Sequence, residues 1–248
     1  MPKTEIHISS DKQAAYKDTA QLFVDLAKAA VAERGVFTVA LSGGSTPKPL
    51  FEMLASPEWA NQIAWSKIEF FWGDERYVPP TDAASNFHMA DVAMLSRVPV
   101  DRNKVHRLLT EKPAQEAATL YEQEIRRVIP VGNAGLPEFD LNFLGLGSNG
   151  HTASLFPHQA ALRENDRLVV ADYVEEVHMM RITMTVPLIN ASRTIMIFVL
   201  GHDKAGVVRE VVQGERDPER LPAQLIQPTS GKLIWMLDAA AASDLRKR

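Results

Sequence analysis

Continuous apolar segments of strand length alternate with helix-like segments along almost the whole 248-residue chain, and this alternation permits few architectures. Strands that read apolar without interruption are typical of a parallel sheet covered on both faces. The segments are VFTVALSG (36–43), IEFFWGD (68–74), FDLNFLGLG (139–147), RTIMIFVLG (193–201) and KLIWMLD (232–238). The pattern predicts an α/β protein with a largely parallel sheet flanked by helices.

The first strand is predicted in TEIHISS (4–10), and a helix follows it. Ser10 and Gln13 have the spacing of a capping box that would open this helix, and Gly35 would end it. Further helices are expected near 86–96, 114–128 and 203–213, and an alanine-rich helix is expected after residue 238.

Glycine and proline concentrate in PVGNAGLPE (130–138), which is the best candidate for a linker. Strand-like segments lie on both sides of it, and one sheet could use both. We therefore expect residues 1–248 to form a single domain without a firm internal boundary.

Composition excludes several classes of protein. The chain has no cysteine, which excludes disulfides, thiolate metal sites and a cysteine nucleophile. It has no apolar run of about 18 or more residues, so we expect no membrane association. The net charge is −4 and the basic residues are scattered, which argues against a nucleic-acid partner. The first residues show no apolar signal segment, and we expect a cytoplasmic protein.

A glycine-rich corner follows the first buried segment. Ser42, Gly43, Gly44, Ser45 and Thr46 precede a proline at the expected helix start. Two glycines let a ligand approach the backbone closely, and successive N–H groups at a helix N-terminus bind anions well. The alternative is an ordinary strand-to-helix turn. The Walker A spacing is absent, so hydrolysis of a nucleoside triphosphate has little support.

Three charged residues, Asp74, Glu75 and Arg76, follow the second buried segment. Ligands of open parallel sheets collect at the carboxyl ends of the strands. Arg76 could grip a phosphate or carboxylate with its two-pronged guanidinium, and the two carboxylates could orient a substrate, hold hydroxyls or transfer a proton. The alternative is a solvated turn with local ion pairs.

The segment GLGSNGH (145–151) matches the dinucleotide fingerprint G-x-G-x-x-G, and LVVAD ends at Asp172, a suitable distance downstream for the ribose partner. Pro157, however, falls where the required helix should be in mid-course. We therefore expect that helix to be very short or absent. The loop is better suited to present His151, the side chain type best able to accept and return a proton near neutral pH.

Three stretches together closely resemble the 6-phosphogluconolactonases: LSGGSTP (41–47), GDERYVPPTDAASN (73–86) and GLGSNGHTASLFP (145–157). Further family-like stretches follow in order and extend the resemblance over nearly the whole chain. It implies a Rossmann-like sheet with a smaller α/β lobe, as in the glucosamine-6-phosphate deaminases and ribose-5-phosphate isomerases. It also implies hydrolysis of 6-phospho-D-glucono-1,5-lactone to 6-phosphogluconate without a metal or organic cofactor.

The resemblance also assigns roles. His151 matches the presumed general base, Arg76 matches a phosphate-site arginine, and the 42–46 corner matches the sugar-phosphate cradle. Lys204 and Arg181 match further cationic contacts. The expected partner is a small phosphorylated lactone, and the chain would be a monomer or a small homo-oligomer.

One position departs from the family pattern. Asn149 stands two residues before His151, where the family often has aspartate. An amide can orient the imidazole but cannot stabilise an imidazolium by charge. Any acidic partner of His151 would then have to be Asp74 or Glu75.

Two other functions compete with lactone hydrolysis. The nearest is a sugar-phosphate isomerase or deaminase on the same fold, although the HTASLFP continuation favours the lactonases. A non-catalytic sugar-phosphate sensor would normally carry a DNA-binding helix-turn-helix, and the chain has no basic segment available for one.

Overall fold

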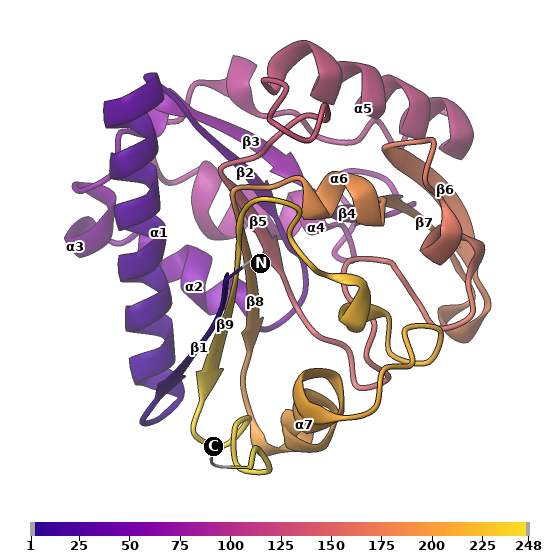
Figure 1. Ribbon diagram of the computed structural model, residues 1–248. Coiled ribbons are helices and arrows are strands. Elements are labelled where there is room, and N and C mark those ends of the chain that lie inside the picture. Colours follow the sequence, from indigo (N-terminus) through magenta and orange to yellow (C-terminus); the bar gives the residue numbers. More distant parts are fainter. Residues whose placement is uncertain (1–2, 247–248) are drawn as a thin grey trace.

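The computed structural model describes residues 3–246 and contains two sheets (Figure 1). The larger sheet has six strands in the order β1-β9-β8-β5-β2-β3, and every neighbouring pair is parallel. Its strands are β1 (Lys3–Ser9), β2 (Phe37–Leu41), β3 (Ile68–Trp72), β5 (Leu141–Leu144), β8 (Thr194–Val199) and β9 (Lys232–Asp238).

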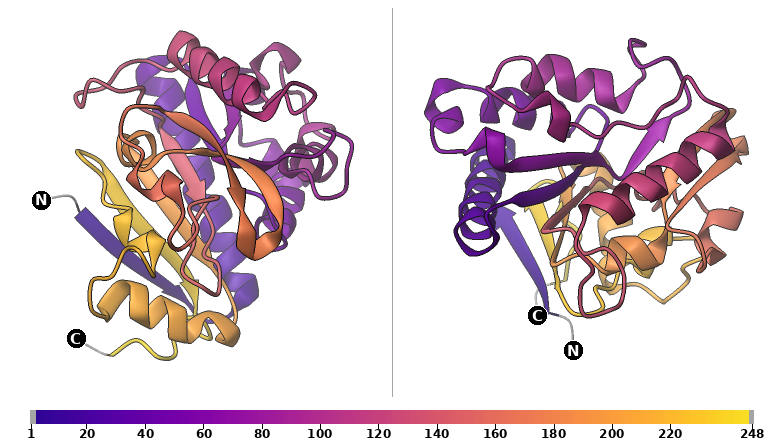
Figure 2. Two further views of the ribbon diagram at one scale, coloured as in Figure 1. Left: turned by 90° about the vertical axis from the view of Figure 1, so that its right-hand side faces the viewer. Right: turned by 90° about the horizontal axis from the view of Figure 1, so that it is seen from above.

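The smaller sheet has three antiparallel strands in the order β4-β7-β6. They are β4 (Asp74–Arg76), β6 (Val169–Val174) and β7 (Met179–Met184). Figure 2 shows α5 (Ala114–Val128) lying across this sheet, where it packs against β6 and β7. The small sheet and α5 together form the smaller lobe.

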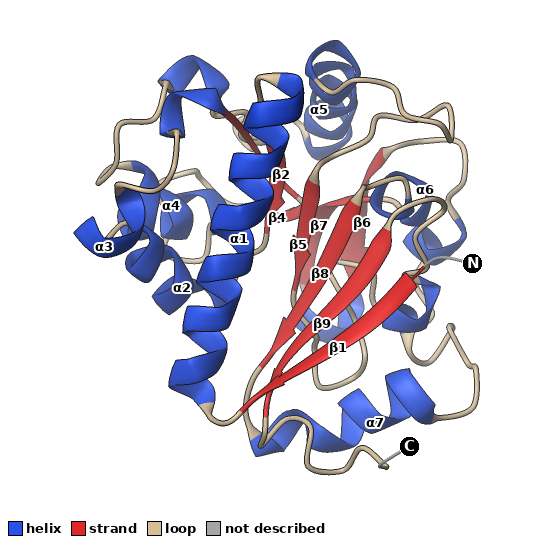
Figure 3. Cartoon of the chain, turned by 60° about the vertical axis from the view of Figure 1, so that its left-hand side comes forward, coloured by secondary structure: helices blue, strands red, loops and turns tan. Residues whose placement is uncertain are grey.

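Helices cover the large sheet, and α1 (Lys12–Arg34) lies along one of its faces against β1, β2 and β9 (Figure 3). The remaining helices are α2 (Pro47–Leu54), α3 (Pro57–Ala60), α4 (Asn86–Ala90), α6 (Val186–Asn190) and α7 (Ala205–Gln213). Short 3₁₀ turns lie at Trp65–Lys67, Arg102–Lys104, Ala160–Arg163, Glu175–Val177, His202–Lys204 and Pro222–Leu225. This arrangement confirms the predicted largely parallel α/β architecture with a smaller lobe.

The helix predictions agree with the structure at some helix ends and differ at others. Gly35 ends α1 in the left-handed conformation, as predicted, with φ of 76°. The predicted capping box is wrong: the side chain of Asp11, not Ser10, caps α1 by accepting a hydrogen bond from the N–H of Ala14 at 2.9 Å. The helix expected at 86–96 is α4 followed by a π-helical turn over Asp91–Leu95.

The alanine-rich helix predicted after β9 is wrong, because residues 239–246 form turns and a bend. The carboxylate of Asp238 accepts hydrogen bonds from the N–H groups of Ala241 and Gly201. The contact with Ala241 is local and of the kind that caps a helix start, but helix propensity alone is a weak preference and no helix follows. Within residues 3–246, no helix combines the length and the apolar character that a membrane crossing requires.

A single residue, Gly73, joins β3 of the large sheet to β4 of the small one. Its N–H donates to the carbonyl of Leu41 in the large sheet, and its carbonyl accepts from the N–H of Met184 in the small one. Next to this junction, the hydroxyl of Tyr121 on α5 bonds both the N–H and the carbonyl of Trp72. These bonds fix the position of the small sheet relative to the large one.

Candidate active site

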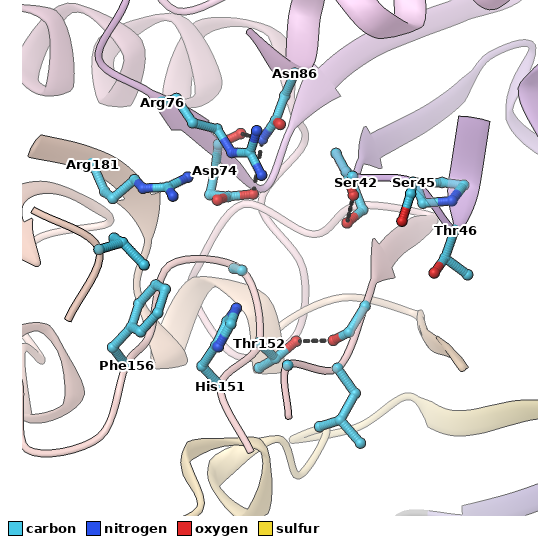
Figure 4. Close-up of a pocket in the computed structure, with 18 of the residues that line it drawn as sticks. Ser42, Ser45, Thr46, Asp74, Arg76, Asn86, His151, Thr152, Phe156 and Arg181 are labelled. Carbon is cyan, nitrogen blue, oxygen red and sulfur yellow. Dashed lines mark hydrogen bonds between the residues drawn. The ribbon is translucent and has the colours of Figure 1, made fainter. Parts of the chain in front are cut away.

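A pocket of about 400 Å³ lies at the carboxyl edge of the large sheet (Figure 4). The loops that follow β2, β3, β5 and β8 all reach it, and these four strands are neighbours in the sheet. This is where open parallel sheets bind their ligands. The lining residues are Ser42, Gly43, Gly44, Ser45, Thr46, Pro47, Asp74, Arg76, Asn86, Gly145, Leu146, Gly147, His151, Thr152, Ala153, Phe156, Val177, Arg181 and Lys204.

The 42–46 corner forms one wall of the pocket, directly before α2. Gly44 has φ of 99°, a left-handed conformation that favours glycine. Gly43 has no room for a side chain, because a Cβ there would lie 1.7 Å from Oδ1 of Asn86. The corner therefore packs directly against the start of α4 and leaves backbone and hydroxyl groups facing the cavity.

The opposite wall carries two arginines from the small sheet. Arg76 on β4 and Arg181 on β7 are directly opposed in the antiparallel register. Like charges at such positions repel each other, and an anion bound between them would remove that repulsion. Within residues 3–246 neither guanidinium forms a salt bridge with a carboxylate, and the Nε of each is buried without a hydrogen-bond partner. This wall is therefore suited to bind an anion.

Asp74 and Glu75 are adjacent in sequence but lie in different environments. Asp74 lines the pocket, and its carboxylate accepts from the hydroxyl of Ser154 at 2.6 Å and from the side-chain amide of Asn86 at 3.3 Å. Glu75 is outside the pocket lining and is 2% exposed. Burial raises the pKa of Glu75, and backbone hydrogen bonds oppose that shift.

The carboxylate of Glu75 accepts several hydrogen bonds from the segment that begins α4 and from its own strand. It accepts hydrogen bonds from the N–H groups of Asn86 and Phe87, from the N–H of Arg76 and from the hydroxyl of Ser85. Ser85 in turn caps α4 by accepting a hydrogen bond from the N–H of His88. These contacts tie α4 to β4.

His151 enters the pocket from the loop after β5. Its ring stacks on Phe156 with centroids 4.0 Å apart, and its Nδ1 lies 2.6 Å from Oδ1 of Asn149. The ring also covers Gly147, where a Cβ would lie 2.1 Å from Nδ1. With one face packed and Nδ1 engaged, Nε2 is the ring nitrogen left for chemistry.

The electrostatic surroundings keep His151 neutral. Burial, followed by the positive charges of Arg181, Lys204 and Arg76, lowers its pKa to about 4. At neutral pH the imidazole is therefore unprotonated and can accept a proton. All three cations line the same pocket as the base.

The structure brings together every site residue predicted from the sequence except Glu75. Neither Asp74 nor Glu75 contacts His151, although these were the acidic partners that the sequence left available; the Nδ1 contact belongs to Asn149. The sequence motifs did not single out Phe156, Thr152 or Asn86, which line the pocket. All three lie within the motifs quoted above, so their motif membership was the available signal.

The dinucleotide alternative lacks the helix it requires. Residues 151–159 form turns and a short β-bridge between Thr152 and Leu155. Asp172, the expected ribose partner, lies on β6 opposite Arg181 in the antiparallel sheet. It is therefore not at the carboxyl end of a parallel strand, where the fingerprint would place it.

The model of the family described as glucosamine-6-phosphate isomerases/6-phosphogluconolactonase matches residues 10–235. The chain belongs to this family. A 6-phosphogluconolactonase from Synechocystis is 45% identical over 219 residues, which cover 88% of each chain. The solved structure of 6-phosphogluconolactonase from Trypanosoma brucei is 27% identical, with a TM-score of 0.88 over 99% of this chain and 100% of that one. A monomeric glucosamine-6-phosphate deaminase shares the fold, with a TM-score of 0.80 at 19% identity over 97% of this chain and 99% of that one.

Proposed function

We propose that the protein is a 6-phosphogluconolactonase that hydrolyses 6-phospho-D-glucono-1,5-lactone to 6-phosphogluconate in the oxidative pentose phosphate pathway. The observation that carries this proposal is a neutral imidazole, His151, in one pocket with two opposed arginines. The names of the relatives and of the Trypanosoma structure support it.

The phosphate of the substrate binds at the cationic wall. Arg76 and Arg181 present adjacent guanidiniums, and Lys204 lines the same pocket from the turn after β8. Guanidiniums bind phosphate oxygens through paired charge-assisted hydrogen bonds. Fixing this end of the substrate positions its lactone carbonyl toward His151 and the 42–46 corner.

The chemical step needs one base, because a lactone is an activated ester. Nε2 of His151 takes a proton from water as the water oxygen attacks C1. Backbone N–H groups of Gly43 and Gly44 stabilise the oxyanion that forms on the carbonyl oxygen, where one such donor is worth about 3 kcal/mol. The C1–ring oxygen bond then breaks, and the imidazolium returns its proton to the departing ring oxygen.

Substrate binding also strengthens the base. The cations that lower the pKa of His151 are the groups assigned to the phosphate. A bound phosphate dianion offsets their charge, so the pKa of His151 is higher in the enzyme–substrate complex than in the free enzyme.

The test is the activity of the purified full chain on three compounds. We expect hydrolysis of the 6-phospholactone, measured against its spontaneous opening, a much lower kcat/KM on unphosphorylated glucono-1,5-lactone, and no ammonia release from glucosamine 6-phosphate. Ammonia release would instead assign the chain to the deaminase activity of its family. Equal kcat/KM values for the two lactones would contradict a phosphate site in this pocket.

A further inference from the structure

A second contact of Asn149 extends the site beyond the pocket. The Nδ2 of Asn149 lies 2.8 and 2.7 Å from the two carboxylate oxygens of Glu176. Oδ1 of the same amide accepts from the backbone N–H of His151 at 3.1 Å and lies 2.6 Å from Nδ1 of its ring. Asn149 thus links the imidazole to a carboxylate that the sequence did not associate with it.

The two outer partners determine which way the amide points. A backbone N–H only donates and an ionised carboxylate only accepts, so the oxygen of Asn149 must face His151 and its nitrogen must face Glu176. Nδ1 of His151 must then carry the proton that it donates to Oδ1. In the neutral ring this leaves the lone pair on Nε2, the atom that faces the pocket.

Glu176 comes from the other sheet. It lies in the 3₁₀ turn Glu175–Val177, which joins β6 to β7, and the neighbouring Val177 lines the pocket. Asn149 lies in the loop after β5 of the large sheet. The side chain of Glu176 is exposed, so its removal leaves no cavity in the core.

We propose that Glu176 is a positioning residue for His151 and acts through Asn149. Its carboxylate holds the amide with the oxygen toward Nδ1, which keeps the base in the tautomer whose Nε2 is free. Without Glu176 only the backbone N–H of His151 still holds the amide oxygen in place. The flipped amide, which presents its NH₂ to Nδ1, is then more populated, and it favours the proton on Nε2, where the ring no longer acts as a base. This inference rests on the proposed function only for its kinetic readout.

The first test compares Glu176→Ala with Glu175→Ala. Glu175 is an exposed acid in the same turn, and its side chain accepts no hydrogen bond from any residue between 3 and 246. We expect Glu176→Ala to lower kcat about three- to tenfold, as for loss of one hydrogen bond, with KM and the control nearly unchanged. Glu176→Gln keeps an acceptor and should recover most of the loss. Equal kcat values for Glu176→Ala and the control would overturn the proposal.

The second test introduces Glu176→Ala into proteins that already carry a substitution at Asn149. If Glu176 acts through the amide, Glu176→Ala should have no further effect on kcat in Asn149→Ala. In Asn149→Asp the new carboxylate contacts Nδ1 directly and faces Glu176 with a like charge, so Glu176→Ala should not lower kcat there. An undiminished loss in these backgrounds would show that Glu176 acts by another route.

The pH profile of kcat distinguishes two effects of Glu176→Ala: the loss of the hydrogen bond to Asn149 and the loss of a negative charge. The charged groups that face His151 are Arg76 on β4, Arg181 on β7, Lys204 after β8 and, through Asn149, Glu176 itself. The pocket also contains Asp74. Loss of orientation by Glu176→Ala lowers the plateau of kcat and leaves the midpoint of its acidic limb nearly in place. A shifted midpoint with an unchanged plateau would mean that Glu176 acts only as a distant charge, which overturns the proposal.

Nitrogen-15 NMR of the histidine rings gives a readout that needs no substrate. The His151 signals, assigned by their absence in His151→Ala, should show a protonated Nδ1 in the wild type and increased Nε2 protonation in Glu176→Ala. An unchanged tautomer in that variant refutes the positioning role even if the protein hydrolyses the lactone. The expected change in a protein that does not hydrolyse it refutes the proposed function alone.

Discussion

The two sheets contribute different kinds of group to the same pocket. The large sheet supplies loops at the ends of its strands: the 42–46 corner with its backbone N–H groups, and the loop that carries His151. The small sheet supplies side chains from the strands themselves, Asp74, Arg76 and Arg181. In the proposed mechanism the reacting groups thus come from loops, and two of the three phosphate-binding cations come from paired strands; the third, Lys204, lies in the turn after β8.

The difference follows from what each structure can hold. A loop after a parallel strand can turn its N–H groups toward a ligand, as a strand inside the ladder cannot. An antiparallel pair keeps opposed side chains close together, and it can therefore hold two guanidiniums side by side against their repulsion. The comparison predicts that changes in the 42–46 corner and the His151 loop alter kcat and that changes of the two arginines on the strands of the small sheet alter KM.

His151→Ala should produce the largest effect. Loss of a general base is expected to lower kcat about 10²- to 10⁴-fold, while the affinity for 6-phosphogluconate changes by only a few fold, because the cationic wall is intact. Single-turnover hydrolysis, corrected for spontaneous lactone opening, measures the first quantity and calorimetry the second. His7→Ala, an exposed site on β1, is the control. A variant with full kcat would contradict the assignment of the base.

Arg181→Ala should move KM instead. Loss of charge-assisted hydrogen bonds of about 1.5–3 kcal/mol raises KM roughly 10- to 100-fold, with a much smaller change in kcat. Arg181→Lys keeps the charge but loses the two-pronged geometry, so it should recover only part of the affinity. Initial rates over a range of substrate concentrations decide this. An unchanged KM in Arg181→Ala would break the comparison between the sheets.

Gly43→Ala tests the place where the two halves of the site touch. The added methyl overlaps the side chain of Asn86, which moves both the corner and α4, so we expect a loss of about 1–3 kcal/mol of stability and a lower kcat/KM. Gly206→Ala is the matched control, since a Cβ there meets nothing within 4 Å. Thermal unfolding and kcat/KM are measured for both variants. Equal unfolding temperatures and equal kcat/KM values for the two variants would mean that the 42–46 corner is loosely packed.

The pH dependence tests whether the charges of the small sheet act on the base of the large one. Activity rises with pH as His151 loses its proton, so the acidic limb of kcat/KM should lie near its free-enzyme pKa of about 4. The limb of kcat should lie about one pH unit higher, because bound phosphate offsets the cations. Arg181→Ala should raise the limb of kcat/KM. Superimposed limbs would contradict this coupling.

The large sheet could be predicted because its strands carry their own signal. Five continuous apolar runs mark β2, β3, β5, β8 and β9, and the bounds of α5 agree with the expected 114–128. The small sheet gave no comparable signal. Its strand β4 has three residues, all charged, and β6 mixes buried residues with exposed Tyr173. Short strands of this kind are determined by tertiary pairing.

The site was predictable at its motifs and not between them. His151, Arg76 and the 42–46 corner follow predicted strands, so their convergence at one edge of the sheet followed from topology. Glu176 lies 27 residues from Asn149, and its contact depends on where the turn between β6 and β7 falls. Asp74 lines the pocket and Glu75 is buried away from it. This difference depends on the pleat of β4 and on the position of α4, which the spacing of residues in the sequence does not show.

The single-residue junction at Gly73 has a consequence for substrate choice. Because its N–H and carbonyl are bonded to different sheets, a hinge movement of the small sheet at this junction would break backbone hydrogen bonds. In the proposed mechanism these bonds restrict changes in the distance between the phosphate-binding arginines and His151. Sugar lactones whose carbonyl and phosphate are separated by fewer carbons would reach one end of the pocket or the other, but not both at once.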